Sequence, residues 1–175
     1  LHGKLYGKSD ITATFKLLLP DTNGHFSMDG NLKNLDAEQI SNTTKALALA
    51  EISSFHISKM DMHVEGNQYE GSGHFTILYN NLKIVLQKVD SSGDKRELND
   101  KPLVSFLANN LVIYSDNPMQ GDSVRSVNTY LKRDPQKSFF SLIWKNIYQG
   151  LEKTVVKNKK IEELAKKKGK KEGFF

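Results

Sequence analysis

Small or apolar residues alternate with polar residues over much of the first ninety positions, which is the period of half-buried β-strands. They occupy every second position from Ile11 to Leu19 and again from Phe26 to Leu32. The segment between these runs, residues 20–24, is rich in turn-forming residues. The pattern predicts an antiparallel hairpin over residues 11–32.

The most regular alternation runs from Tyr69 to Tyr79 and places its aromatic and aliphatic side chains on one face. Asn80 and Asn81 can adopt the positive φ angles of a two-residue turn, so we predict a second hairpin with residues 82–89. This turn would align apolar pairs on a single face of the hairpin. The predicted pairs are Tyr79 with Leu82, Ile77 with Ile84, and Phe75 with Leu86. Glycines at 71 and 73 favour a flat strand that another backbone or a ligand approaches closely.

Two local signals modify this picture between the hairpins. Asp36 followed by Gln39 is the pattern of a capping box and predicts a short helix over residues 36–42, with a further helical turn as an option over 43–50. The apolar positions change parity near Ser58 and Lys59, as a β-bulge or a shift between the faces of the sheet would require. One of these two irregularities is therefore expected in the strand over residues 55–64.

Residues 90–101 are polar and rich in turn formers, and we expect an exposed loop there. Pro102 suits the first position of a helix over residues 103–110. Strands are expected at 112–114 and at 124–133, the latter being the last. From Lys137 the period becomes helical, and Gly150 interrupts the helix without ending it.

One stripe of the predicted C-terminal helix is apolar. Its residues are Phe140, Ile143, Trp144, Ile147 and Leu151. Such a stripe is typical of a helix packed on a sheet. Because tryptophan is also favoured at membrane interfaces, contact with a membrane or a protein partner is the alternative.

These elements predict a mainly β fold with minor α content. We expect a curved antiparallel sheet of hairpins that forms an open groove or half-barrel, with short helices and a C-terminal amphipathic helix. A single domain is expected over residues 1–156, as the C-terminal fragment of a longer protein with its targeting segment upstream.

Charge separates a neutral body from a basic tail. Residues 157–175 carry a net charge of +5, which is the formal net charge of the whole chain. We interpret this tail as a solvated segment whose lysines, Lys166, Lys167 and Lys168 among them, contact an anionic membrane or a partner. Lysine outnumbers arginine by 22 to 3, which argues against a folded surface for nucleic-acid recognition.

The residues offer little for covalent chemistry. The chain has no cysteine and five histidines, and none of the histidines occurs in an HxH or HExxH spacing. No serine lies in a Gly-x-Ser-x-Gly elbow, and no glycine-rich loop is followed by Lys-Ser or Lys-Thr. We therefore predict no catalytic residues, no metal site and no cofactor, and hence a protein that is not an enzyme.

Several segments, taken in order, resemble the AsmA-like family of Gram-negative envelope proteins, in particular the C-terminal region of members from the Bacteroides group. The resembling segments are residues 28–37, 57–64 with 71–73, 78–84, 103–109, and 133–140 with Trp144 and Lys145. The resemblance implies a periplasmic protein that is anchored upstream in the inner membrane. It also implies a long curled sheet with an apolar groove that handles phospholipid between the inner and outer membranes.

No functional residue of that family carries over through a motif, so candidate lipid contacts come from the apolar hairpin face alone. They are Phe75, Ile77, Tyr79, Ile84 and Leu86. An acyl chain lying along this face would gain about 0.8 kcal/mol for each buried methylene. The rival interpretation is a structural or protein-interaction module, in which the apolar faces close on one another and the C-terminal helix binds a protein partner of the envelope.

Overall fold

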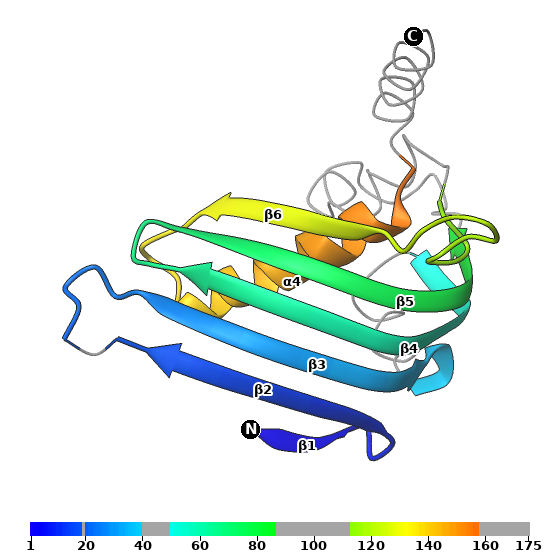
Figure 1. Cartoon of the computed structure of the whole chain (residues 1–175), viewed down its shortest axis with the longest axis horizontal. Coiled ribbons are helices and arrows are strands. Elements are labelled where there is room, and N and C mark those ends of the chain that lie inside the picture. The colour runs from blue at the N-terminus through cyan, green and yellow to red at the C-terminus, as the bar shows by residue number, and fades with distance from the viewer. Residues whose placement is uncertain (19, 40–49, 87–112, 158–175) are drawn as a thin grey trace, which may run out of the picture.

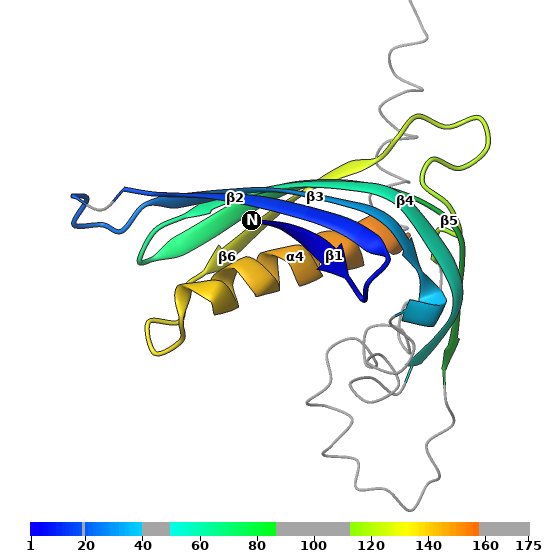
Figure 2. The same cartoon turned by 90° about the horizontal axis from the view of Figure 1, so that it is seen from below.

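The computed structural model describes residues 1–18, 20–39, 50–86 and 113–157, with the backbone alone for 50–53 and 84–86. Six strands form one antiparallel sheet in the order of the chain, and one long helix follows them (Figure 1). The elements are β1 (His2–Leu5), β2 (Ser9–Leu17), β3 (Phe26–Asp36), β4 (Ala50–Gly66), β5 (Glu70–Leu86), β6 (Ser126–Lys132) and α4 (Phe139–Val155). The sheet is open, with β1 and β6 as its edges, and it arches over α4 (Figure 2). The predicted mainly β class with a curved, open antiparallel sheet is confirmed.

The first predicted hairpin is confirmed as β2 and β3. Phe15 lies opposite Met28 and Leu17 opposite Phe26, so the alternating apolar residues of both strands share the concave face. In the connecting loop the Asp21 carboxylate accepts hydrogen bonds from the backbone N–H groups of Asn23 and His25, each at 3.0 Å. The side chain of one residue thus organises the loop.

The second predicted hairpin is wrong. β5 runs through Asn80 and Asn81 without reversing, so the predicted pairs Tyr79 with Leu82, Ile77 with Ile84 and Phe75 with Leu86 do not form. The strand that pairs with this segment is β4, which places Met60 opposite Ile77 and Ile57 opposite Tyr79. The turn of this hairpin lies over residues 67–69, where the Asn67 side chain accepts hydrogen bonds from two backbone N–H groups.

A line of irregularities crosses the three central strands and replaces the predicted turn. Asn34 in β3 and Asn81 in β5 both have positive φ, 56° and 57°. Between them β4 shifts register at Ser58, which confirms the predicted irregularity. At each of these points the buried positions switch between even and odd residue numbers. In β3, for example, the buried residue before the irregularity is Leu32 and the one after it is Leu35. Bulges bend strands and increase their twist, so these irregularities, at Ser58 beside Asn34 and at Asn81 opposite residues 54–56, account for the sharp curl of β4 and β5 (Figure 2).

We predict that Asn81→Gly changes the free energy of unfolding by less than about 0.5 kcal/mol, because glycine adopts positive φ without steric cost. The hydrogen bonds at Asn81 that the structure describes use its backbone: its N–H donates to Asp116 Oδ1 at 3.0 Å and its carbonyl accepts from Ser54 Oγ at 2.5 Å. Urea unfolding measures the change. The matched variant Asn81→Val should lose about 1 kcal/mol or more, because a β-branched residue is strained at this φ. Equal stability of Asn81→Val and the parent would contradict the bulge.

The core lies between the concave face of the sheet and α4. Phe75 is fully buried, and its ring is held between two glycines: a Cβ on Gly73 would lie 2.6 Å from Phe75 Cε2, and one on Gly150 would lie 2.5 Å from Phe75 Cδ2. Leu142 approaches Gly71 in the same way, at 2.9 Å. The close approach predicted at the 71–73 glycines is thus made by the core side chains Phe75 and Leu142, the latter from α4. α4 continues through Gly150 without the predicted interruption, and the lack of a side chain there gives room for the ring of Phe75.

The face of α4 that packs on the sheet includes polar residues. Asn146 is fully buried, accepts a hydrogen bond from Thr129 Oγ1 of β6 at 2.6 Å and donates one to the Leu142 carbonyl at 3.0 Å. Thr154 is also buried and donates to the Gly150 carbonyl at 2.7 Å. Buried polar groups cost little when their hydrogen bonds are made, so these residues are compatible with a core position.

The predicted docking stripe is therefore wrong in part. Ile143 is buried, whereas Phe140 is 60% exposed and Trp144 is 66% exposed. Ile147 and Leu151 are half-buried. The stripe lies on one flank of the packing face rather than at its centre.

Other sequence predictions have mixed outcomes. The backbone N–H of Asp36 donates to Gln39 Oε1 at 2.8 Å, which confirms the capping box, and residues 37–39 are helical. β6 confirms the last strand. The end of the 36–42 helix, the helical option over 43–50, the loop at 90–101, the helix at 103–110 and the tail beyond Lys157 lie outside the described residues.

Candidate functional site

The concave face of the sheet is apolar from β2 to β5, but α4 packs against only part of it. The helix contacts β5 and β6, with slight contact to β4. Figure 2 shows α4 beneath this half of the arch. The concave side of β2 continues the apolar face beyond the helix with Ile11, Ala13, Phe15 and Leu17.

The two flanks of α4 differ in chemistry. On one flank, Lys153 Nζ donates to the Asn128 carbonyl at 2.9 Å and Gln149 Oε1 accepts from the Tyr130 N–H at 3.3 Å, so this flank lies along β6. By the helical period, Phe140, Trp144, Ile147 and Leu151 lie on the opposite flank. That flank faces the concave side of the strands that α4 does not cover.

Exposed apolar side chains from β2 and α4 meet at this place. The rings of Phe15 and Phe140 lie edge to face with their centroids 6.2 Å apart, and Phe139 makes a similar contact with Phe26 of β3 at 5.2 Å. Phe15 is 39% exposed and Leu17 is 55% exposed. We name Phe15, Leu17, Phe140 and Trp144 the apolar band. It is the candidate functional site.

The residues predicted as lipid contacts lie elsewhere. Phe75, Ile77 and Tyr79 are in the core, with at most 5% of their surface exposed. Ile84 and Leu86 belong to β5, but their side chains lie outside the described part of the chain, as do Lys166, Lys167 and Lys168. Of the four residues in the apolar band, the sequence predicts Phe140 and Trp144 as membrane or partner contacts. It does not predict Phe15 and Leu17 as contact residues.

Tyr79 has a structural role in this arrangement. Its hydroxyl donates to the Tyr114 carbonyl at 3.1 Å, and burial raises the pKa of Tyr79 to about 12. Its backbone pairs with Asn117, whose side chain donates to the Ile77 carbonyl at 2.6 Å. The phenol is therefore neutral and hydrogen-bonded at physiological pH.

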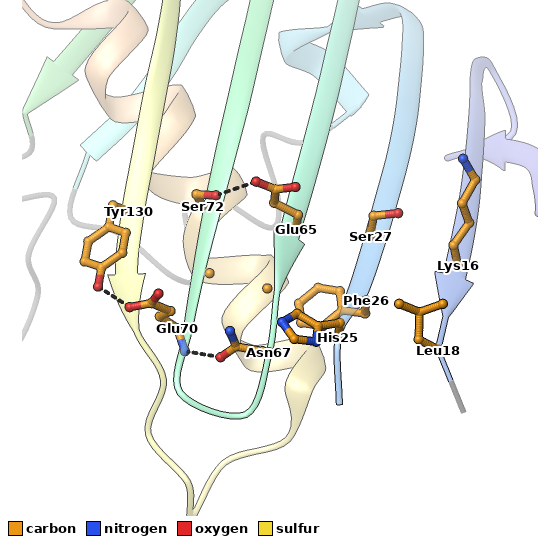
Figure 3. A pocket seen from close by; sticks show the side chains of 12 residues that line it. Lys16, Leu18, His25, Phe26, Ser27, Glu65, Asn67, Glu70, Ser72 and Tyr130 are labelled. Carbon is orange, nitrogen blue, oxygen red and sulfur yellow. Dashed lines mark hydrogen bonds between the residues drawn. The ribbon is translucent and has the colours of Figure 1, made fainter. Parts of the chain in front are cut away.

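The convex face carries a shallow hollow of about 520 Å³ at the end of the sheet that holds the 67–69 turn (Figure 3). Register places Lys16, Ser27, Glu65, Ser72 and Tyr130 in one row across β2 to β6, and all of them line the hollow. The Tyr130 hydroxyl donates to Glu70, which raises the pKa of Tyr130, and Ser72 Oγ donates to Glu65 at 3.3 Å. Four of the polar side chains that line this hollow are thus paired with one another.

A second polar row on the convex face contains two of the histidines. His63 Nδ1 lies 2.6 Å from Asp29 Oδ1, and His74 Nδ1 lies 2.8 Å from Asn128 Oδ1. The hydrogen bond from His63 holds the pKa of Asp29 below its usual range. Among the described residues, no three His, Asp or Glu side chains converge as metal ligands. These contacts have the form of cross-strand pairs that stabilise a sheet.

Comparisons with known proteins do not assign the chain to a family: it matches no protein-family model, no curated protein and no solved structure. Within the described ranges, no helix has the length and apolar character needed to cross a membrane.

Proposed function

We propose that this chain binds an acyl-chain lipid between the apolar flank of α4 and the concave face of β2. The observation that carries the proposal is the apolar band, in which four large side chains from two distant segments remain 39–66% exposed on the open side of the sheet. Clustered exposed apolar residues on a folded domain mark surfaces that receive an apolar partner.

The physical basis of binding is burial of apolar surface. Each methylene of an acyl chain that leaves water contributes about 0.8 kcal/mol, so burial of about ten methylenes supplies the roughly 8 kcal/mol of micromolar affinity. The band offers aromatic and aliphatic groups with no charged residue among its members, and hydrophobic burial is not directional. We therefore expect affinity for phospholipid acyl chains with little selectivity among them, and no covalent chemistry.

The proposed setting is the periplasm of a Gram-negative envelope, in a protein held to the inner membrane by an upstream segment. The resemblance of the segments within residues 28–145 to the AsmA-like family supports this setting, and the open curved sheet is compatible with it. In that setting the chain contributes a section of a lipid path between the inner and outer membranes.

The rival function, a structural or protein-interaction module, is favoured by one observation. The part of the concave face on β4 and β5 is closed by α4, with Phe75 and Ile77 at 0% and 1% exposure. A module of this kind would use the apolar band to bind a protein. The two functions differ in whether isolated lipid binds.

A binding assay with a fluorescent phospholipid decides between them. We predict that the double variant Phe15→Ser/Phe140→Ser weakens binding at least about tenfold, because it removes two apolar contacts worth more than 1 kcal/mol together. The far-ultraviolet circular dichroism should not change, since both side chains are substantially exposed.

The matched control is Val124→Ser, which alters a 45% exposed apolar residue outside the band. It should bind lipid like the parent. Equal affinity of the parent and the double variant would exclude the band as the lipid site. Absence of binding by the parent would favour the protein-interaction module.

A further inference from the structure

A cluster of cations surrounds the beginning of α4. The segment from Lys132 to Lys145 contains Lys132, Arg133, Lys137 and Lys145 against one carboxylate, Asp134, which lies 3.7 Å from Lys137. Arg133, Asp134, Lys137 and Lys145 line one narrow cleft between the end of β6 and the first turns of the helix. Lys132 borders this cleft from the end of β6, where it follows Tyr130 on the convex face and lies opposite Glu70. Although the residues of the cleft are spread along the sequence, the fold brings them to one surface, which we name the cationic cleft.

The helix end adds to this positive character. The first turn of α4 has no acidic residue, and the Ser138 side chain makes no capping hydrogen bond. Helix N-termini carry a partial positive charge that acidic residues commonly offset. Here lysines lie beside that charge, so the electrostatic potential at this end is strongly positive.

Exposed aromatic side chains lie next to the cationic cleft. Trp144 is adjacent in sequence to Lys145. By the helical period both side chains point away from the sheet, Trp144 toward one flank of α4 and Lys145 toward the other. Phe140 lies one turn before Trp144 on the same flank. Trp144 is 66% exposed, which is unusual for a side chain with so much apolar surface.

We infer that the first turns of α4 are a docking surface for an anionic lipid bilayer. Trp144 and Phe140 enter the interfacial region of the bilayer, while Lys137 and Lys145 contact the headgroup phosphates. Tryptophan is favoured at this depth, and each lysine beside an anionic leaflet strengthens the association. The net positive charge of the cluster is complementary to such a leaflet.

Docking in this way fixes the orientation of the protein on the membrane. The outward side of α4 faces the bilayer, so the concave side of the sheet, over which α4 lies, opens toward the membrane (Figure 2). This inference does not rest on acyl-chain binding by the apolar band. A chain that adsorbs to vesicles without extracting a lipid would leave it intact.

The chain contains one tryptophan, so its fluorescence reports on this surface directly. We expect vesicles of phosphatidylcholine with about a third phosphatidylglycerol to shift Trp144 emission to shorter wavelength and to protect it from acrylamide. Vesicles of phosphatidylcholine alone should do neither at the same lipid concentration. Raising the salt concentration should reverse the shift, because surface charges are screened within about 10 Å at 0.1 M salt.

The variant Lys137→Gln/Lys145→Gln in the full chain should weaken the vesicle-induced shift at least about tenfold, as loss of two lysines near an anionic surface predicts. The matched control Lys8→Gln/Lys33→Gln makes the same change in net charge away from α4. It should bind vesicles like the parent, and thermal unfolding should show that both variants are folded.

Several results would overturn the inference. Vesicle sedimentation without any change in Trp144 emission would place the contact elsewhere, the basic tail beyond Lys157 being the obvious source. Equal binding by the two double variants would exclude the cationic cleft. An equal shift with uncharged vesicles would show that electrostatics has no part. Phe140 and Trp144 take part in both proposals, but the lysine variants leave the apolar band unchanged. They therefore test the docking separately from the lipid-binding assay on Phe15 and Phe140, and the two proposals can fail separately.

Discussion

Replacing Ile77 with Asp is expected to unfold the protein. Ile77 is 1% exposed and lies in the core beside Phe75 and Tyr79. An unpaired carboxylate at such a position costs several kcal/mol, which is comparable with the 5–15 kcal/mol that stabilises a typical domain. Circular dichroism and urea unfolding should show a chain that is largely unfolded or has lost more than about 4 kcal/mol.

The matched control for this experiment is His74→Asp, which introduces the same charge on the exposed convex face of the same strand. It should cost less than about 1 kcal/mol, since surface substitutions are usually tolerated. On the sequence alone, Ile77 is a candidate lipid contact, and the charge would then spoil ligand binding and leave the fold intact. A stable, folded Ile77→Asp protein would restore that interpretation.

The second large effect is expected at Gly150, where Ala should destabilise the protein although alanine is the better helix former. In an exposed helix this change would gain about 1 kcal/mol. Here the new Cβ would lie 2.5 Å from the ring of Phe75, which is itself held against Gly73, so the ring has little room to move. Overpacking of a core costs about 1–3 kcal/mol, and we predict a net loss of about 1–2 kcal/mol in urea unfolding.

A double-mutant cycle identifies the cause of that loss. In the background of Phe75→Leu, whose smaller side chain leaves space, Gly150→Ala should cost markedly less than in the parent. The coupling energy should exceed about 0.5 kcal/mol. If Gly150→Ala stabilises the parent, or if the two changes are additive, then Phe75 does not lie against Gly150 as described.

Local sequence patterns predicted those elements whose geometry is decided by nearby residues. The β2–β3 hairpin follows from the alternation around residues 20–24, and the irregularity at Ser58 follows from the change of parity there. The capping box at Asp36 is likewise a signal contained within four residues.

The error at Asn80 and Asn81 has a physical reason. An asparagine with positive φ serves equally in a tight turn and in a bulge, and both restore apolar residues to the same face of the sheet afterwards. The difference is whether the chain reverses direction, which depends on the strand that pairs with it. That strand, β4, lies more than twenty residues earlier in the sequence, so the local pattern could not decide the matter.

The packing face of α4 was misjudged because the prediction counted large apolar side chains. The centre of the face contains Asn146, Gly150 and Thr154, whose burial depends on one hydrogen bond from β6 and on room for Phe75. Phe140 and Trp144 are displaced to the flank as a result. The apolar band itself was not predictable, because it joins β2 to α4 across more than a hundred residues.

Photo-crosslinking with a phospholipid that carries a diazirine at the end of one acyl chain tests the central claim most directly. After irradiation, peptide mapping should find the label on the segment that contains Phe15 and Leu17 and on the α4 segment from Phe140 to Leu151. Excess unlabelled phospholipid should compete for both positions. Labelling confined to convex-face residues such as Ser72, or no competable labelling at all, would contradict an acyl-chain site between β2 and α4.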